Sequence, residues 1–275
     1  MYLLSDGVYV ILYHISGYRK EVVMKNLSIA FPEKTEKEKV TIAKEFYHNF
    51  TDTFIETIKL LSVNDKELAK RYTSNNEVVT EIYNSGVNIQ LHAGHFFNWE
   101  FVNLGETLLG KYSFVGVYMP ITNKAFDKMM RKLRSRYGTI LVPAGDFKTK
   151  FHQYVNKQYI LGLAADQNPG NPLAAHWVKF FDRLTPFVTG PEKGAKMNNT
   201  PVVFAHFYKI KRGYYHTQFE IITRTPCDFE TGQLTQLFAS YVEKAIREKP
   251  ANYLWSHRRW KWEFNEDKYG HLVVK

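Results

Sequence analysis

The chain has 275 residues, a formal net charge of +10 and a single cysteine. This length is enough to bury a substantial core, and no Gly/Ser-rich or Pro-rich linker divides the chain, so we expect one main domain with an N-terminal helical extension. Cys227 alone cannot form a disulfide within the chain. The excess of basic and aromatic residues is compatible with nucleic acid, an anionic membrane or an acidic protein as partner.

Residues 2–15 form an apolar stretch that Asp6 and Gly7 interrupt. As a helix rising 1.5 Å per residue it would span about 20 Å, short of the roughly 30 Å hydrocarbon core of a bilayer. There is no basic segment followed by a small-residue cleavage site, so a secretory signal is not expected. We expect residues 1–32 to be a helical segment lying on the membrane surface, the alternative being helices packed on the core. The predicted lipid-facing residues are Tyr2, Leu3, Leu4, Tyr9, Ile11, Leu12 and Tyr13, with Arg19 and Lys20 at the headgroups.

A second helical pattern covers residues 17–30 and ends at Phe31-Pro32. Thr35 then precedes Glu38 by three positions, which is typical of a capping box at the start of a helix. An apolar stripe at helical spacing follows, and such a stripe usually faces a core. Its members are Ile42, Phe46, Phe50, Phe54, Ile58 and Leu61. A short helix over residues 65–72 and an edge segment over residues 78–83 come next.

Residues 87–91 are a short apolar run between Gly86 and Gly94, which predicts a strand, and helical spacing resumes after Asn98. His95 therefore lies on a strand-to-helix turn. Asn98 is a plausible N-cap that places Glu100 in the first helical turn. An imidazole beside a carboxylate suits general-base activation of a hydroxyl group.

Two alternatives compete with this catalytic interpretation. His95 could be a hydrogen-bonded turn residue and Glu100 a surface helix residue. His92, His95 and Glu100 could instead bind a metal, but no cysteine cluster or H-E-x-x-H motif supports this. We expect neither a metal nor a cofactor.

Strand-like and helical patterns alternate through the middle of the chain and predict an α/β fold, with a mostly parallel central sheet and helices on both faces. One predicted helix, which begins after Asn123, has a strongly basic face, although charge runs are often only solvated. Its basic residues and those just after it are Lys124, Lys128, Arg131, Lys132, Arg134 and Arg136. The predicted strands cover residues 112–118, 139–142, 159–165, 201–208 and 214–222, and the predicted helices residues 147–156 and 234–248, with another after Pro191.

Four stretches resemble one family in the same order along the chain. The string from His95 to Glu100 resembles the H-x4-D/E motif of glycerolipid acyltransferases, in the form used by the bacterial lipid A late acyltransferases, the lauroyl/myristoyl transferase family. Residues 26–32 resemble its N-L-x-x-A-F-P segment, Asp166-Gln167 its D-Q strand end, and residues 255–261 its W-x-H-R-R-W-K signature. Phe180-Phe181-Asp182 departs from the family's more frequent F-F-G.

The resemblance implies transfer of an acyl chain from an acyl thioester, on acyl carrier protein or coenzyme A, to a hydroxyl of a glycolipid, a lipid A precursor. His95 would be the base and Glu100 its partner, holding the ring in one tautomer. The essential arginine of the family would be Arg134 or Arg136, and Asp166 a supporting carboxylate that orients the arginine or the histidine loop. Residues 33–275 would form the acyltransferase domain, with residues 1–32 associating with the membrane.

The implied location is the cytoplasmic face of the inner membrane of a Gram-negative bacterium, with an anionic membrane surface as a partner. The interleaved Trp and Arg residues of the C-terminal signature suit a headgroup-level surface. They could also stack nucleic acid, but the chain has no RNA-binding module and we expect no nucleic acid. Two rival functions remain: acyl transfer to a lysophospholipid or an amino-acid-linked lipid, and a non-catalytic membrane-surface protein with the same fold.

Overall fold

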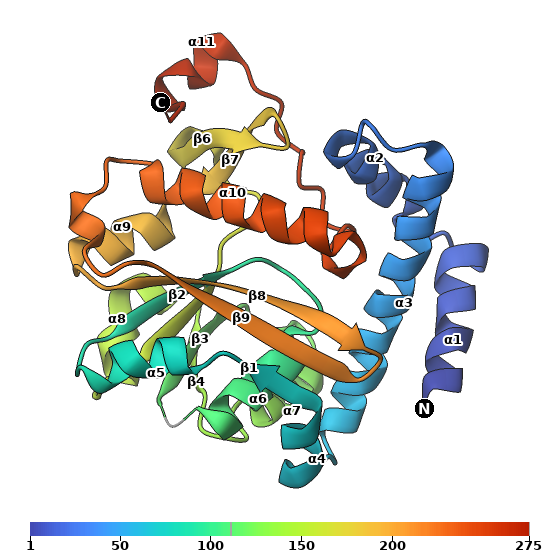
Figure 1. Ribbon diagram of the computed structural model, residues 1–275, viewed down its shortest axis with the longest axis horizontal. Coiled ribbons are helices and arrows are strands. Elements are labelled where there is room, and N and C mark those ends of the chain that lie inside the picture. The colour runs from blue at the N-terminus through green and yellow to red at the C-terminus, as the bar shows by residue number, and fades with distance from the viewer. Residues whose placement is uncertain (111, 275) are drawn as a thin grey trace.

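A seven-stranded sheet lies at the centre of the computed structural model, which describes residues 1–110 and 112–274 (Figure 1). The strand order is β1-β9-β8-β2-β5-β3-β4, and all neighbours are parallel except β8 and β9, which form an antiparallel hairpin. The predicted α/β class with a mostly parallel sheet is confirmed. The strands are β1 Tyr72–Ser74, β2 Ile89–Ala93, β3 Phe114–Tyr118, β4 Ile140–Pro143, β5 Ile160–Ala164, β8 Val202–Lys211 and β9 Tyr214–Thr223.

Helices cover both faces of this sheet. On one face, α5 (Glu77–Asn84) packs Val79 and Ile82 against β2 and β8. On the other, Phe238 of α10 (Gln233–Glu248) packs against Phe204. The apolar spacing of each helix puts one side on the sheet and the polar side in solvent. The other α-helices after residue 60 are α4 Asp65–Arg71, α6 Trp99–Leu109, α7 Lys124–Arg134, α8 Phe147–Tyr154, α9 Gly190–Met197 and α11 Glu266–Tyr269.

One local prediction is wrong, and one element of the structure was not predicted. The edge segment expected over residues 78–83 is wrong: it is the helix α5, because Val79 and Ile82 are three positions apart and share one helical face. The hairpin of β6 (Ala175–Phe180) and β7 (Arg183–Val188) was not predicted. Its turn holds Phe181 and Asp182 at φ of 51° and 55°, left-handed values at which Asp is tolerated better than most residues.

The N-terminal helices are packed on the long helix that follows them in the chain. They are α1 Tyr2–Val10, a π-helical turn Ile11–Ile15 and α2 Lys20–Ala30, and α1 runs alongside α3, Glu36–Leu60 (Figure 1). The predicted capping box is present: the Glu38 amide donates to the Thr35 hydroxyl at 3.3 Å, and the Thr35 amide donates to the Glu38 carboxylate at 2.8 Å.

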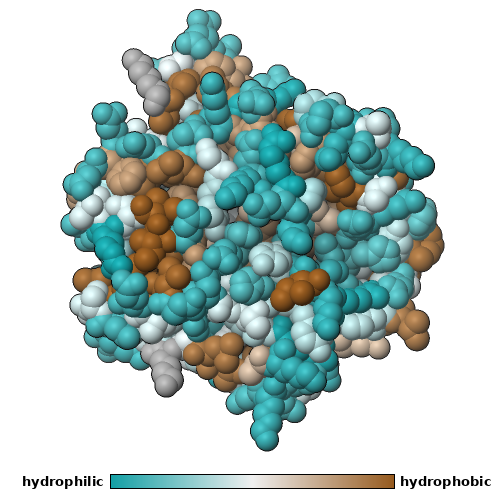
Figure 2. Space-filling view, viewed as in Figure 1, coloured by the Kyte–Doolittle hydropathy of each residue, from teal (hydrophilic) through white to brown (hydrophobic). Residues whose placement is uncertain are grey.

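The lipid face predicted for α1 is divided by this packing. Tyr9 and Tyr13 are buried against α3, and the Tyr2 hydroxyl donates to Glu56 of α3, so these three tyrosines face protein, contrary to the prediction. Leu3, Leu4 and Ile11 are exposed, and Figure 2 shows apolar side chains at the edge of the molecule where α1 lies. Among the described residues, no helix is both long and apolar enough to cross a membrane.

The apolar stripe of α3 changes character along the helix. Phe46 is buried and Phe50 half-buried, as expected for a core stripe. Phe54 and Ile58 are 52% and 61% exposed, so the second half of the stripe faces outward. Phe54 in this exposed half contacts Phe50, and Phe50 contacts Phe97 in the turn that carries His95.

Candidate active site

His95 and Asp166 occupy matching positions on neighbouring strands. Ala93 at the end of β2 pairs with Ala164 at the end of β5, and each site residue comes two positions later. The strands are parallel, so their carboxyl ends meet at the same edge of the sheet, where α/β folds place ligands. Sheet register alone therefore brings the imidazole and this carboxylate together.

Nδ1 of His95 lies 2.6 Å from Oδ1 of Asp166. Asp166 is fully buried, whereas the His95 side chain is 26% exposed and can be reached from outside. Burial by itself would lower the pKa of His95, but the attraction of Asp166 and the hydrogen bond to it outweigh burial and raise the pKa. Burial likewise disfavours the charged form of Asp166, yet the interaction with His95 lowers the pKa of that carboxyl to about 2.

This geometry fixes the tautomer of His95. Because Asp166 is ionised at neutral pH, it accepts a hydrogen bond from Nδ1–H, and Nε2 of the neutral ring is left as the acceptor. An imidazole held in this way can take a proton from a hydroxyl group and stabilise the positive charge that results. The arrangement is that of a general base and its orienting carboxylate.

Glu100 has a different partner from the one expected. Asn98 caps α6 by accepting from the amides of Glu100 and Phe101, as predicted, which places Glu100 in the first turn. From there its carboxylate faces α7, where Arg134 donates from Nε at 3.0 Å and from Nη2 at 2.5 Å. The carboxylate that bonds the His95 ring is therefore Asp166, and Glu100 belongs to a buried ion pair beside it.

The two candidate arginines have distinct surroundings. Arg134 forms the paired hydrogen bonds with Glu100, whose attraction and hydrogen bonds outweigh burial and raise the pKa of the guanidinium. Arg136 instead donates to the backbone carbonyls of Leu60 and Val63, at 3.1 Å and 2.7 Å, at the end of α3. Only Arg134 is joined to the turn that carries His95.

The segment just before the C-terminal signature supports the turn that carries His95 through backbone hydrogen bonds. The amide of Leu254 donates to the His95 carbonyl at 3.1 Å, and the amide of Phe97 donates to the Asn252 carbonyl at 3.0 Å. His257 lies near Asp166 and His95, and burial lowers its pKa to about 4, so its ring is neutral at physiological pH. Sequence reasoning missed Asn252 and Leu254, which act through backbone groups and leave no residue-type signal.

The C-terminal signature is largely internal. Trp255 and Arg259 are buried, contrary to the headgroup-level surface predicted for them. Arg259 donates from Nη2 to the Pro186 carbonyl at 3.0 Å, and its guanidinium lies 4.2 Å from the centre of the Phe187 ring. Asn26, from the first family motif, donates to the carbonyls of Trp255 and His257 at 2.8 Å and 2.7 Å. The motif at residues 26–32 and the C-terminal signature at residues 255–261 are therefore joined by hydrogen bonds.

A row of aromatic rings connects His95 to the exposed half of α3. The ring centres of His95 and Trp99 are 6.4 Å apart, and those of Trp99 and Phe97 are 6.1 Å apart. Phe97 lies 6.2 Å from Phe50, which lies 4.9 Å from Phe54. Phe97 in the middle of this row is buried, Trp99 and Phe50 are half-buried and Phe54 is exposed, so the row joins the imidazole to the surface at α3.

A basic groove of about 840 Å³ runs along α7. Its cationic residues face a wall that includes Pro120, Ile121 and Leu141. The helix that presents these cations also carries Arg134, so the groove and the ion pair with Glu100 share one rigid element. The cations that line the groove are Lys124, Lys128, Arg131 and Lys132.

One protein-family model, described as bacterial lipid A biosynthesis acyltransferase, matches residues 3–262 of the chain. No curated protein matches it. The matched range includes all the site residues, from Asn26 to Arg259.

Proposed function

From the premise that this chain belongs to the bacterial lipid A biosynthesis acyltransferase family, we propose that it moves a fatty acyl chain from acyl carrier protein to a hydroxyl group of a lipid A precursor. The observation that carries the proposal is the 2.6 Å contact between His95 and a buried Asp166, with the imidazole accessible from outside. The basic groove suits an anionic donor, which both an acidic carrier protein and coenzyme A with its phosphates provide, and the donor comparison in the assay separates the two.

In the proposed reaction His95 is the general base. Its Nε2 takes the proton of the acceptor hydroxyl while that oxygen attacks the thioester carbonyl carbon, and Asp166 stabilises the imidazolium. The tetrahedral intermediate then collapses with cleavage of the carbon–sulfur bond, and the imidazolium returns the proton to the departing thiolate. The products are an ester and the free thiol of the donor. General-base assistance of this kind contributes roughly 10²–10⁴-fold in rate.

We assign a binding role to the Glu100–Arg134 pair. A guanidinium beside the base can bind a phosphate of the acceptor or the oxyanion of the intermediate through charge-assisted hydrogen bonds. Glu100 is then the residue that orients Arg134, and it is not a proton carrier. The aromatic row from Trp99 to Phe54 is proposed to guide the acyl chain, since each buried methylene contributes about 0.8 kcal/mol.

The experiment that tests the function is product analysis with defined substrates. Purified protein is incubated with acyl carrier protein loaded with one acyl chain, and separately with the matching acyl-coenzyme A, each with a lipid A precursor or a lysophospholipid. Mass spectrometry should show one added acyl chain on the lipid A precursor, with faster transfer from the carrier protein. Acylation of the lysophospholipid alone, or of neither acceptor, would refute the proposed acceptor or the proposed activity.

The exposed apolar residues of α1 and of the π-helical turn after it are proposed to attach the protein to the cytoplasmic face of the inner membrane, in line with residues 1–32 as a membrane-associating segment. Replacing Leu3, Leu4 and Ile11 together by serine should weaken binding to anionic vesicles at least tenfold, because a fully buried Leu or Ile contributes about 1.5–3 kcal/mol. Vesicle co-sedimentation measures this.

The matched control replaces two exposed apolar residues outside α1, Leu173 and Met197, by serine. Vesicle binding by this control should equal that of the parent protein. If the α1 variant also binds as tightly as the parent, the membrane role of α1 is refuted. These substitutions leave the buried Tyr9 and Tyr13 in place, so α1 stays packed on α3.

A further inference from the structure

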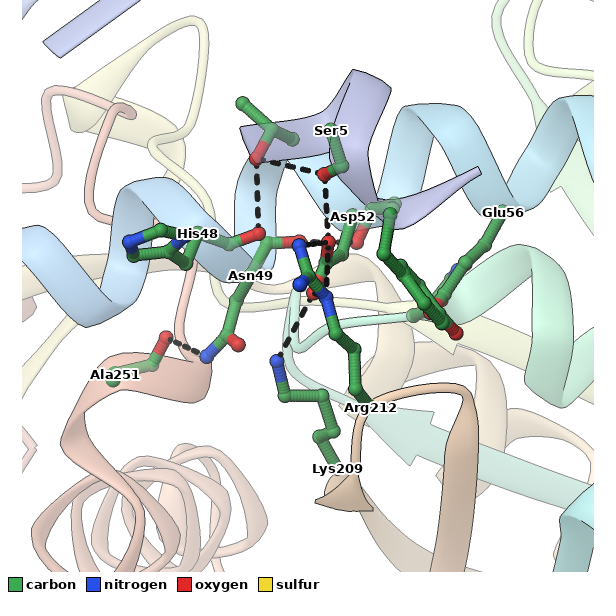
Figure 3. Close-up of polar contacts among 12 residues, drawn as sticks. Ser5, His48, Asn49, Asp52, Glu56, Lys209, Arg212 and Ala251 are labelled. Carbon is green, nitrogen blue, oxygen red and sulfur yellow. Dashed lines mark hydrogen bonds and ion pairs between the residues drawn. The ribbon is translucent and has the colours of Figure 1, made fainter. Parts of the chain in front are cut away.

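A buried acidic pair on α3 lies under the N-terminal helix, and neither member belongs to the proposed chemistry. Asp52 and Glu56 are one helical turn apart and are 1% and 2% exposed. Ser5 and Arg212 converge on Asp52, while Glu56 lies one turn further along α3 (Figure 3). A carboxylate buried to this extent needs several hydrogen-bond donors. The residues that donate to Asp52 and to Glu56 therefore show which elements each carboxylate connects.

The side chains that donate to Asp52 come from α1 and from the hairpin of β8 and β9. Its oxygens accept from the Ser5 hydroxyl at 2.6 Å and from Arg212 Nη2 at 2.7 Å, and Lys209 Nζ lies 3.4 Å away. Arg212 also contacts Asp6 at 2.5 Å. This half of the pair therefore joins α1, α3 and the β8–β9 hairpin to one another.

Glu56 has donors of a different kind. Oε1 accepts from the Tyr2 hydroxyl at 3.0 Å, and Oε2 accepts from the Tyr215 hydroxyl at 2.5 Å and from Asn98 Nδ2 at 3.2 Å. Asn98 is fully buried, and its other side-chain atom, Oδ1, caps α6 at the amide of Glu100. Glu56 thus contacts the residue that fixes where α6 begins.

We propose that Glu56 is a positioning residue for the turn from His95 to Glu100, which it holds through the side chain of Asn98. The two tyrosines fix the carboxylate, the carboxylate fixes the Asn98 amide, and the amide sets the orientation of the first turn of α6. Tyr2 belongs to α1, so the N-terminal helix contributes to the same chain of contacts. The inference rests on the proposed acyl transfer, because its readout is the rate of that reaction.

The hydrogen-bond donors and acceptors predict that a second substitution, Glu56→Gln, restores the kcat that Asn98→Asp loses. Asn98→Asp keeps an N-cap acceptor of equal quality but sets a second carboxylate against Glu56, so kcat should fall at least tenfold. Glu56→Gln alone should keep most of the activity, because its amide oxygen accepts from Asn98 and its NH2 group can donate to the Tyr2 hydroxyl. In the double variant the glutamine amide that replaces the Glu56 carboxylate can donate to the new aspartate, so kcat should recover to within about threefold of the parent value.

The parent protein, Asn98→Asp, Glu56→Gln and the double variant are compared by kcat and KM with a defined acyl donor, and by melting temperature. Asp52→Asn is the matched control, since it alters a buried carboxylate one turn away that does not contact Asn98; its melting temperature should fall while kcat stays within twofold of the parent. A double variant no more active than Asn98→Asp would overturn the proposal, as would a kcat for Asn98→Asp equal to that of the parent. If the parent protein itself transfers no acyl chain, the proposed function has failed, whereas an active parent without rescue refutes the role of Glu56 alone.

Discussion

Replacement of Asp166 by asparagine is expected to lower kcat by about 10³–10⁴-fold with little change in KM. The asparagine side chain has nearly the same shape, but its NH2 group can donate to Nδ1 of His95 and so favour the tautomer in which Nε2 carries the proton. In that tautomer the ring cannot accept the proton of the acceptor hydroxyl. Steady-state kinetics with a defined donor measures the effect, and a kcat within tenfold of the parent would show that Asp166 does not orient the base.

The same variant should change the pH profile. His95 must be neutral to act as a base, and Asp166 raises its pKa, so activity of the parent should fall as the pH drops through a value above the 6.5 of a free imidazole. Without the carboxylate, burial lowers the pKa, and the acid limb of kcat against pH should move to lower pH. Glu100→Gln is the control, since Glu100 does not bond the ring; its acid limb should stay where the parent has it.

Replacement of Arg134 by methionine is expected to lower the free energy of unfolding by about 2–4 kcal/mol. Breaking a fully buried ion pair costs roughly 3–5 kcal/mol because one charge is left without a partner. Glu100 is 5% exposed at its side chain but Arg134 is 23% exposed, so water offsets part of this loss. We also expect kcat/KM to fall about 10²–10³-fold, as when a charged transition-state donor is removed.

Arg136→Met provides the comparison that separates the two arginines. It removes two hydrogen bonds to backbone carbonyls at the end of α3, which should cost about 1–3 kcal/mol of stability without a change in kcat. Urea denaturation gives the stabilities, and the kinetic assay gives the activities. A loss of kcat/KM in Arg136→Met larger than in Arg134→Met would reverse the assignment of the anion-binding residue.

Most of the fold could be predicted from local patterns in the sequence. The apolar run over residues 87–91 and the helical spacing after Asn98 are properties of neighbouring residues, and they place His95 correctly on a strand-to-helix turn. The hairpin of β6 and β7 was missed because its turn uses Phe181 and Asp182 in left-handed conformations, where glycine or asparagine is the usual signal.

The partners within the site were harder to predict, because they depend on contacts between distant segments. Closeness in sequence favoured Glu100 as the partner of His95, but the register between β2 and β5 brings Asp166 to the ring instead. Glu56 gave no signal at all: a glutamate within a long helix suggests a solvated face. It is buried because side chains from α1, β9 and the start of α6 surround its carboxylate, which a pattern along α3 does not reveal.

The contacts of Asn26 with the carbonyls of Trp255 and His257 join positions 229 and 231 residues apart in the sequence. Loop closure over such a separation is slow compared with the formation of local helices and hairpins. During synthesis, β2 and α6 leave the ribosome long before the segment that braces the back of His95. The turn that carries His95 therefore lacks the backbone contacts that support it until residues 252–257 have emerged and folded back, so we expect the candidate site to form late in folding.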